Sequence, residues 1–505
     1  MENQKVYEEL AAPEPEGTNT GVWPLTARRQ ADGGLEIGGV STAQIASDFG
    51  TPIYVLDEVD FRTRAAAWKQ AMDAAFVDLA GADVYYACKA FASVGVCRWA
   101  LEEGLRLDTC SEGEMRTALA AGATGEQLGL HGNNKSRREI QQALEHEVGH
   151  LVVDSLAELA HVADVAHWGD DGGTVAKVML RVTTGIHAGG HEYISTAHED
   201  QKFGLSIASG EAWEAISETL RHPRLQLVGL HSHIGSQIFA SEGFVAAARD
   251  LMDLRARVYT EHGIVLPEVD FGGGFGIRYT AADPAPLRPE TYAQALAEVV
   301  RTHTAETGIS APRVSIEPGR SIIGPAGVTL YEVGTIKNVQ LEGGRTRRYI
   351  SVDGGMSDNI RPALYGANYT AALANRVPEK PSMVESTAAN AAATAADAVT
   401  ADASPAGAST ADEGTGSAGV VSRVVGKHCE SGDIVVRDVS LPADVTAGDI
   451  LAVPATGAYG RSMASNYNML PRPGVISVRD GQAHWLVYSE EVPDLLSLDA
   501  EYTGE

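Results

Sequence analysis

The sequence contains a lysine whose position could make it a nucleophile. Residues 84–88 are rich in β-branched and aromatic side chains, which is typical of a strand, and Lys89 follows them directly. Most lysines just past a strand are solvated. A partly buried amine with a lowered pKa could instead form a Schiff base with a carbonyl group. The lysine alone leaves both interpretations open, so the residues predicted to surround it must decide.

Two histidines and a glycine cluster follow two further runs of this kind. His231 and His233 would share one face, because side chains alternate along a strand, and they could bind a metal or stack on a planar cofactor. Stacking is favoured, since other clear ligands are missing and a barrel metallohydrolase would carry its H-x-H pair on the first strand. The stretch 270–276 contains four glycines. Glycines often form tight turns. This cluster, however, follows the seventh of eight strand-like runs described below, and that position favours a phosphate-binding loop.

An acid and an arginine follow the last run. Glu317 could face a pyridine nitrogen and keep it protonated, while Arg320 could grip a substrate carboxylate through a bidentate contact. A surface ion pair is the simpler interpretation of these two residues by themselves. Together with a reactive lysine, a phosphate loop and a ring-stacking histidine, however, the acid matches the chemistry of pyridoxal 5′-phosphate. We therefore predict this cofactor and no bound metal.

A regular alternation of apolar runs and helical segments predicts the elements that would bring these residues together. Eight runs alternating with helices indicate parallel βα units, and eight such units close a TIM (β/α)8 barrel. In a barrel, the residues that follow the strands share one rim, where active sites lie. Loops are polar in any protein, but that alone does not explain this combination of residue types. The runs cover residues 84–88, 104–107, 127–130, 151–153, 176–182, 225–230, 268–271 and 313–316.

A second, mainly antiparallel β domain is predicted outside the barrel. The sequence becomes β-rich after residue 327, and short strand-like pieces near the N-terminus could complete the same sheet. We expect the barrel at 58–320 and the second domain from 1–57 and 321–505. Residues 378–419 are mostly Ala, Thr, Ser, Gly and Asp, and cannot bury enough apolar surface to offset the entropy of ordering. We predict that they form a disordered insertion.

The overall composition excludes several classes of function. The chain has 505 residues and 44% hydrophobic content, enough for a large core, and its net charge of −28 argues against general nucleic-acid or anionic-membrane binding. No apolar run is long enough to span a membrane, and the N-terminus lacks the pattern of a signal peptide. Four cysteines without a C-x-x-C pair predict neither a disulfide framework nor a zinc site. We expect a cytoplasmic enzyme with a small-molecule substrate.

As an ordered set, these motifs resemble those of the fold-type III pyridoxal-phosphate decarboxylases, and among them the diaminopimelate decarboxylases. The resemblance extends from about residue 50 to 470, and the set is highly specific. One departure is the low-complexity tract, which lies where the family usually has a much shorter connection. We expect it to loop out without disturbing the β domain. The matching stretches are 86–91, 107–114, 130–135, 191–196, 202–204, 231–237, 272–276, 317–320, 429–433 and 457–460.

The resemblance implies a role for each residue of the cofactor site. Lys89 would hold the cofactor as a Schiff base, and His233 would stack on its ring. Glu317 would contact the ring nitrogen, and Ser236 with the loop 273–276 would bind the phosphate. The cofactor-binding residues expected on this basis are Lys89, Asp108, His233, Ser236, Gly273, Gly274, Gly276, Glu317, Gly319, Arg320 and Tyr459.

The family's substrate site implies a contribution from a second chain. Family members are homodimers whose Cys-Glu-Ser segment enters the partner's active site, so Cys429 and Glu430 would act in trans. Cys429 would return the proton to the substrate carbon, although a small buried hydrophobe is the commoner fate of a free cysteine. The substrate-binding residues expected on this basis are Arg320, Arg361, Tyr365, Glu430 and Tyr459, and the catalytic residues are Lys89 and Cys429.

The activity that the resemblance implies is decarboxylation of meso-2,6-diaminopimelate to L-lysine and CO2, the last step of lysine biosynthesis. Arg320 and Arg361 would bind the distal carboxylate of this substrate, and Glu430 would accept from its ammonium group. The alternatives are a related decarboxylase of ornithine, arginine or carboxynorspermidine, a non-catalytic cofactor-binding paralogue, and a metal-dependent barrel hydrolase. A racemase of the same fold type is disfavoured, because a carboxylate at Glu317 suits full carbanion stabilisation.

Overall fold

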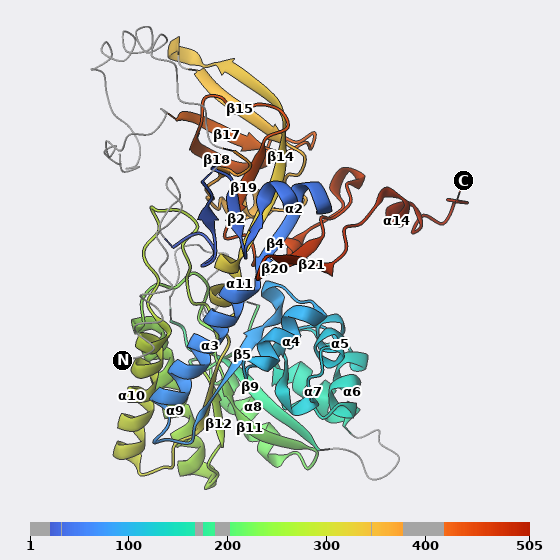
Figure 1. Cartoon of the computed structure of the whole chain (residues 1–505). Helices are drawn as coiled ribbons and strands as arrows, with labels where there is room; N and C mark the ends of the chain where they lie inside the picture. Colours follow the sequence, from blue (N-terminus) through green and yellow to red (C-terminus); the bar gives the residue numbers. More distant parts are fainter. Residues whose placement is uncertain are drawn as a thin grey trace.

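The structure is a computed structural model that describes residues 21–504, except 32, 167–174, 187–201, 345 and 377–418. The predicted disordered insertion, apart from its last residue, and the 191–196 stretch of the resemblance lie outside the described residues. Figure 1 shows two bodies, a barrel with surrounding helices and a β-rich domain at one end of it.

Eight parallel strands close into a barrel, which confirms the TIM-barrel prediction. Each strand pairs with the next along the chain, the eighth pairs with the first, and a short extra strand, β10 (Leu205–Ser206), adds to the fifth. Parallel strands direct their carboxyl ends toward one rim, so the loops that follow them meet there. The barrel strands are β5 (Ala82–Ala87), β6 (Arg106–Thr109), β7 (Leu128–Leu130), β8 (His150–Val153), β9 (Ala176–Thr183), β11 (Leu225–His231), β12 (Glu268–Asp270) and β13 (Arg313–Ile316).

Helices follow the strands and cover the outside of the barrel. Four consecutive helices begin after a serine, and Ser93, Ser111, Ser136 and Ser155 each accept a hydrogen bond from the N–H three residues on. Such caps satisfy a donor that the first helical turn leaves unpaired, so each loop from the rim has a defined end. The helices are α3 (Glu58–Ala75), α4 (Val94–Glu102), α5 (Glu112–Ala120), α6 (Arg137–Glu145), α7 (Leu156–Val165), α8 (Glu211–Arg221), α9 (Glu242–His262), α10 (Pro289–Thr307) and α11 (Arg320–Ala326).

An aromatic cluster anchors the glycine-rich loop after β12 to the outer helices. Phe275 from that loop stacks on Phe244 of α9 with ring centroids 4.8 Å apart, and the ring of Trp68 of α3 packs against Phe275 with centroids 4.3 Å apart. Tyr292 of α10 meets the Phe275 ring edge-on at 4.9 Å. All four rings are buried, and burying a ring of this size stabilises the fold by about 2–3 kcal/mol. These ring contacts therefore hold the glycine-rich loop against the outer helices.

The second domain is a mainly antiparallel sheet, as predicted. Its strand order is β18–β17–β15–β14–β4–β20–β21, with β19 beside β14 and β16 beside β19, and only the β15–β17 and β4–β20 pairs are parallel. The N-terminal strand β4 thus lies in the middle of a sheet formed otherwise by C-terminal strands. The bounds are β4 (Ile53–Asp57), β14 (Gly327–Gln340), β15 (Thr346–Val352), β16 (Ala372–Leu373), β17 (Val420–Val425), β18 (Ile434–Leu441), β19 (Ile450–Pro454), β20 (Val475–Arg479) and β21 (Gln482–Val487).

Smaller elements complete this domain and join it to the barrel. A three-stranded sheet of β1 (Arg28–Arg29), β2 (Leu35–Ile37) and β3 (Val40–Ser41) precedes α2 (Thr42–Phe49), a short helix that the sequence did not suggest. The N–H of Tyr459 and the hydroxyl of Ser462 both donate to the Ala90 carbonyl, at 2.8 and 2.9 Å. The turn that carries Lys89 is therefore tied to the β domain.

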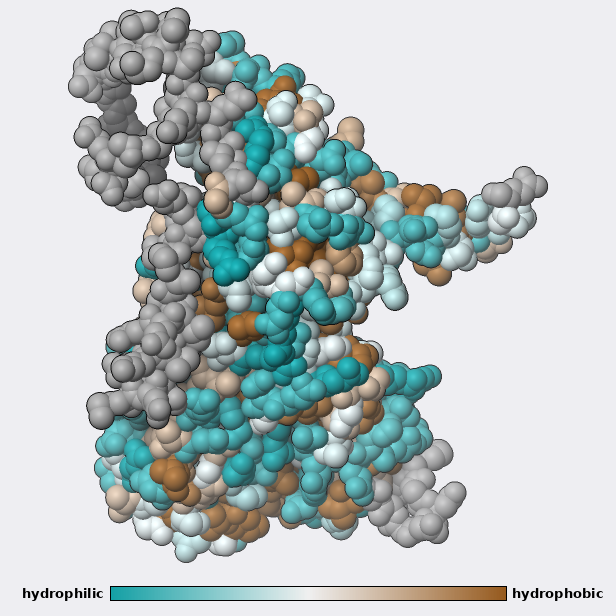
Figure 2. Space-filling view, in the orientation of Figure 1, coloured by the Kyte–Doolittle hydropathy of each residue, from teal (hydrophilic) through white to brown (hydrophobic). Residues whose placement is uncertain are grey.

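The outer surface is mostly polar on the face shown in Figure 2, with hydrophobic residues scattered over it. The last described segment, which includes the short helix α14 (Val492–Leu496), extends away from both bodies in Figures 1 and 2. Within the described ranges, no helix combines the length and the apolar character needed to cross a membrane.

Candidate active site

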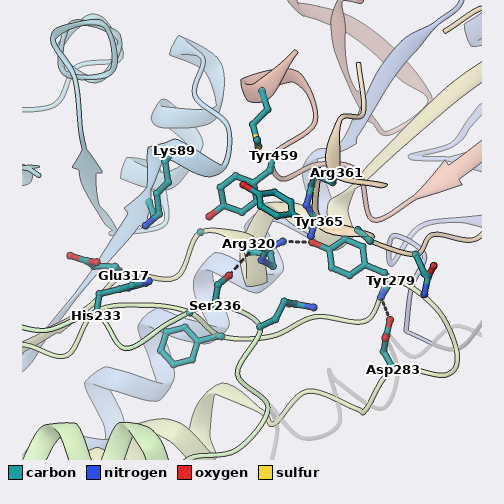
Figure 3. Close-up of a pocket in the computed structure, with 18 residues that line it drawn as sticks. Lys89, His233, Ser236, Tyr279, Asp283, Glu317, Arg320, Arg361, Tyr365 and Tyr459 are labelled. Atoms are coloured by element: carbon teal, nitrogen blue, oxygen red, sulfur yellow. Dashed lines mark hydrogen bonds between the residues drawn. The ribbon is translucent and has the colours of Figure 1, made fainter. Parts of the chain in front are cut away.

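Two adjoining cavities lie at the carboxyl rim of the barrel, and three predicted residues line both. The first cavity has a volume of about 380 Å³ and the second about 320 Å³; Lys89, His233 and Glu317 belong to each. Figure 3 shows the first cavity, with residues of the barrel on one side and of the β domain on the other. The other predicted residues that line the first cavity are Ser236, Gly274, Gly319, Arg320, Arg361, Tyr365 and Tyr459.

Lys89 occupies a turn just beyond β5, and Figure 3 shows its side chain in the first cavity. The Lys89 side chain is exposed, and it lines both cavities. Burial lowers the pKa of Lys89, but Tyr459, Asp108 and Glu317 outweigh burial, so the pKa is raised above its usual value. Of the two interpretations that the sequence left open, the amine with a lowered pKa does not describe Lys89 in this structure.

Glu317 is a buried carboxylate at the end of β13. Its Oε1 lies 3.0 Å from Nε2 of His131 and 3.3 Å from Nε2 of His231. Burial raises the pKa of Glu317, but the two histidines outweigh it and hold the pKa well below its usual range. Among the described residues, Oε1 has no hydrogen-bond donor. A buried anion of this kind is suited to a protonated nitrogen of a bound ring.

His233 presents a neutral ring to the same space. Burial, together with the positive charges of Lys89 and Arg181, lowers the pKa of His233 well below its usual value. Its Nδ1 accepts a hydrogen bond from the Gly273 N–H at 3.1 Å, so the proton of the neutral ring is on Nε2. A neutral ring fixed through its edge can stack on a planar cofactor, as the sequence predicted.

His231 has a different position from the one expected for a ring-stacking residue. It is buried beside Glu317, and its ring meets that of His131 edge-on at 4.9 Å. Potential ligand atoms of these three residues lie within 4.8 Å of one another, so the group has the composition of a metal site. The same carboxylate cannot both bind a metal there and face the nitrogen of a cofactor ring.

The loops after β11 and β12 make a candidate anion site at the rim of the barrel. They are joined by hydrogen bonds from the Ile238 N–H to the Gly274 carbonyl and from the Gly276 N–H to the Ile238 carbonyl, each 3.0 Å long. A Cβ on Gly274 would overlap the Gly235 carbonyl oxygen, so this close approach requires glycine. Within the described part of the chain, the N–H groups of Gly274 and Phe275 have no partner, and both residues line the first cavity. Two free backbone donors in a loop suit a phosphate.

Ser236, in the loop after β11, and Arg320, the first residue of α11, add side-chain groups to this anion site. Nη2 of Arg320 donates to Oγ of Ser236 at 3.0 Å, which leaves the hydroxyl proton of the serine free to donate to a ligand. The Arg320 guanidinium also donates to the Tyr279 hydroxyl and lies 4.5 Å from the centre of the Tyr459 ring. The arginine is therefore fixed at the wall of the cavity, as Figure 3 shows.

A second arginine enters the first cavity from the β domain. Arg361 begins the short helix α12 (Arg361–Tyr365), donates to the Tyr369 hydroxyl and lies 4.5 Å from the centre of the Tyr279 ring. Tyr365, at the end of the same helix, lines the cavity too. Two arginines held by aromatic rings at one side of the cavity make that side suitable for a carboxylate that is distant from the cofactor.

Not every predicted residue lies in the first cavity. Asp108 lines the second cavity, with Oδ1 3.3 Å from Nε2 of His131, and burial raises its pKa to about 7. Gly273 and Gly276 belong to the anion-binding loop, but their N–H groups are used by His233 and Ile238. Cys429 and Glu430 are exposed in the loop between β17 and β18 and line neither cavity.

Some residues of the site were not predicted. Arg181 of β9 lines the second cavity, where its guanidinium lies 4.4 Å from the centre of the Phe203 ring and 3.7 Å from an Asp154 carboxylate oxygen. An arginine among the inner residues of a barrel strand, next to the buried run Val178–Leu180, was the signal that could have identified it. Tyr279, which holds both cavity arginines, had no recognisable signal, because it follows the glycine loop without a motif.

These observations fit pyridoxal 5′-phosphate. At one end of the site, free N–H donors, a serine and an arginine are suited to bind a phosphate. At the other end, the Glu317 anion, which has no hydrogen-bond donor, is suited to a protonated ring nitrogen. Lys89 and the neutral His233 lie between the two ends (Figure 3). On a TIM barrel joined to a β domain, this chemistry defines the class of fold-type III pyridoxal-phosphate enzymes.

Comparison with known proteins supports this class and narrows it. The family described as the pyridoxal binding domain of pyridoxal-dependent decarboxylases matches residues 58–324. Diaminopimelate decarboxylase from Corynebacterium efficiens is 45% identical over 95% of this chain and 94% of its own length. The Mycobacterium tuberculosis enzyme of that name is 44% identical over 95% and 97%.

A solved structure agrees with these relatives. Diaminopimelate decarboxylase from M. jannaschii in complex with L-lysine superposes with a TM-score of 0.80 at 28% identity, over 94% of this chain and 98% of that one. The chain belongs to the diaminopimelate decarboxylase family. The family resemblance drawn from the sequence motifs is thereby confirmed.

Proposed function

We propose that this protein decarboxylates meso-2,6-diaminopimelate to L-lysine and CO2, the last step of lysine biosynthesis. Relatives with 40–45% identity over nearly the whole chain carry that activity in their names. The observation within the site that supports this substrate is the pair of arginines, Arg320 and Arg361, on one side of the first cavity. Diaminopimelate has a second carboxylate at its far end, whereas ornithine has none, so two fixed guanidinium groups favour the former.

The cofactor site assigns the first set of roles. When bound, pyridoxal phosphate supplies an electron sink for the electron pair that departing CO2 leaves behind. Lys89 would hold the cofactor covalently through Nζ, and Glu317 would keep a proton on the ring nitrogen. His233 would stack on the ring, and Ser236, Arg320 and the N–H groups of Gly274 and Phe275 would bind the phosphate. Asp108, Gly273, Gly276, Gly319 and Tyr459 would shape the same site.

The substrate site would be completed by a second copy of the chain. Arg361 and Tyr365 would bind the distal end of the substrate in cis. Cys429 and Glu430 are exposed and lie outside both cavities, which supports a homodimer in which they enter the partner's site. There, Sγ of Cys429 would return the proton to the substrate carbon, and Glu430 would accept from the distal ammonium group.

A substrate panel tests the reaction. The purified protein, with the absorbance of its lysine-bound cofactor recorded, is incubated with diaminopimelate, ornithine and arginine, and CO2 release is measured from each. We expect release from diaminopimelate and its loss in Lys89→Ala, while Lys177→Ala, an exposed lysine in β9, should retain it. Faster release from ornithine or arginine, or lysine formation by Lys89→Ala, would reject the proposal.

Hybrid dimers test the arrangement in trans. Lys89→Ala and Cys429→Ala chains should each be nearly inactive alone. Mixed dimers contain one site with an intact lysine from one chain and an intact cysteine from the other, so they should regain activity. If mixing restores nothing, Cys429 acts within its own chain or has no role.

The remaining proposals concern organisation and location. Residues 58–320 would form the cofactor-binding unit, and 1–57 with 321–505 the second unit, with 378–419 as an insertion in it. All four cysteines are free thiols, which favours a reducing compartment such as the cytoplasm.

A further inference from the structure

The loop that carries Cys429 is packed against the segment that leads to Arg361. Residues 426–433 connect β17 to β18, while residues 353–360 connect β15 to α12. The N–H of Lys427 donates to the Gly354 carbonyl at 3.0 Å. A Cβ on Gly355 would lie 2.5 Å from Oδ1 of Asp433, so the two segments approach as closely as a glycine allows. The first cavity is lined by Arg361, to which one segment leads, and by no residue of the other.

A buried aspartate joins the two segments. Asp433 is only 3% exposed; its Oδ1 accepts the Met356 N–H at 2.7 Å, and its Oδ2 accepts the His428 N–H at 2.8 Å. Each oxygen of the carboxylate thus binds one of the two segments. Hydrogen bonds to a charged acceptor are stronger than neutral ones, and removing one partner leaves the other unsatisfied in the interior.

His428 makes the second link, through its side chain. Its Nε2 lies 3.3 Å from the Ser357 N–H, which donates to it, and 2.8 Å from the Ser357 hydroxyl. Nε2 is therefore an acceptor, and Nδ1 carries the proton that it donates to Oδ1 of Asn468 at 3.0 Å. The ring also stacks on Tyr467 with centroids 5.3 Å apart. Both ring nitrogens and one face of His428 are used to hold the residue that precedes Cys429.

Ser357, which is hydrogen-bonded to His428, is connected to Arg361 through a turn held by further hydrogen bonds. The next residue, Asp358, is buried; its carboxylate accepts the Gly355 N–H at 2.8 Å and the Tyr331 hydroxyl at 2.5 Å. The Asn359 N–H bonds back to the Gly355 carbonyl at 3.0 Å, and α12 begins two residues later with Arg361. Hydrogen bonds therefore connect His428 to the turn that leads to Arg361.

We propose that His428 is a positioning residue that, with Asp433, joins the Cys429 loop and the Arg361 turn into one hydrogen-bonded unit. This inference rests on the proposed function, in which Arg361 acts in its own cavity and Cys429 in the partner's. Each chain then sets the substrate-binding arginine of one site and the proton donor of the other through the same contacts. A substitution at His428 has a different effect on each of the two sites that its chain serves.

Hybrid dimers with a single working site separate these two effects. In such a dimer, the Cys429→Ala chain supplies the working cavity, and the Lys89→Ala chain supplies the working loop. His428→Asn is placed in one chain or the other, because asparagine is too short to reach Ser357. In the loop-supplying chain it is expected to lower kcat about tenfold, with only a smaller rise in KM because Glu430 lies on the same loop. In the cavity-supplying chain it is expected to raise KM for diaminopimelate about tenfold with kcat unchanged.

Two further variants distinguish positioning from general damage. His428→Gln places a carbonyl oxygen near the position of Nε2, so it should keep the bond to Ser357 and rescue most of the loss. His484→Ala removes an exposed histidine of β21 and should leave both parameters unchanged. Ser357→Ala deletes the hydroxyl partner and should repeat the pattern of His428→Asn more weakly, which keeps the test available if that variant does not fold.

The outcomes are distinguishable. The same change in kcat and KM from either chain, or a His428→Gln variant as impaired as His428→Asn, overturns the inference alone. An inactive parent hybrid without any change at His428 overturns the arrangement in trans, and this inference with it. A split of kcat and KM between the two chains supports both.

Discussion

Replacing Glu317 with glutamine tests the electrostatic basis of the cofactor site. The substitution keeps the shape of the side chain and removes its negative charge. The carboxylate is 5% exposed, and histidine nitrogens lie 3.0 and 3.3 Å from its Oε1, so water screens it little. At an effective dielectric constant of about 20, a unit charge at about 4 Å contributes roughly 4 kcal/mol. If half or more of that is lost, kcat falls by about 30- to 1,000-fold.

The assay separates this loss from a loss of cofactor. The anion site and Lys89 are unchanged in Glu317→Gln, so bound cofactor, measured by absorbance, should stay near one per chain. CO2 release from saturating diaminopimelate then gives kcat. As a matched control, Glu268→Gln alters a carboxylate at the other end of the barrel, where it contacts His150, and should retain full activity. A fully loaded Glu317→Gln enzyme with kcat within about threefold of the native value would refute the reasoning.

Three other substitutions have specific expected effects on substrate binding, cofactor binding and stability. Arg361→Lys keeps the charge but loses the planar fork that Tyr369 and Tyr279 hold, so KM for diaminopimelate should rise about tenfold in steady-state assays, with kcat little affected. Gly274→Ala would force the two anion-site loops apart, and spectroscopic titration should show at least about tenfold weaker cofactor binding. Burial, reinforced by Asp60, raises the pKa of Asp57 from 3.8 to about 6, which favours the protonated form in the folded state. The stability this contributes, at most about 3 kcal/mol, is full below pH 4 and lost as the pH rises through about 6, so urea midpoints measured at pH 4.5 and 7 should differ less in Asp57→Asn than in the native protein.

The barrel could be predicted because its signal is repeated and local. Each of the eight apolar runs became a strand, with ends shifted by up to two residues; the run predicted at 104–107 is β6 at Arg106–Thr109, for example. Such shifts arise because hydrogen bonding to neighbouring strands, rather than the sequence of one run, decides where a strand ends. The short helix α2 escaped notice, because eight residues carry too little periodicity to stand out.

The chemistry of the site was only partly predictable, because several properties depend on residues far apart in the chain. The direction of the Lys89 pKa is set by Asp108, Glu317 and Tyr459, which come from three separate parts of the chain. The glycine motif pointed to the right loop, but which N–H groups remain free follows from how Ile238 and His233 use the others. Motifs locate such a loop, and only the packed structure assigns its donors.

The place of β4 in the second sheet has a consequence for how the protein is made. The barrel strands occupy one continuous stretch, from Ala82 to Ile316, so they can pair in order as the chain leaves the ribosome. The strand β4 is synthesised before all of them, yet its partners β14 and β20 begin only at Gly327 and Val475. It must therefore wait, with both edges unpaired, until almost the whole chain has emerged. A nascent chain can hold a closed barrel while its active site still lacks the cover that the second domain provides.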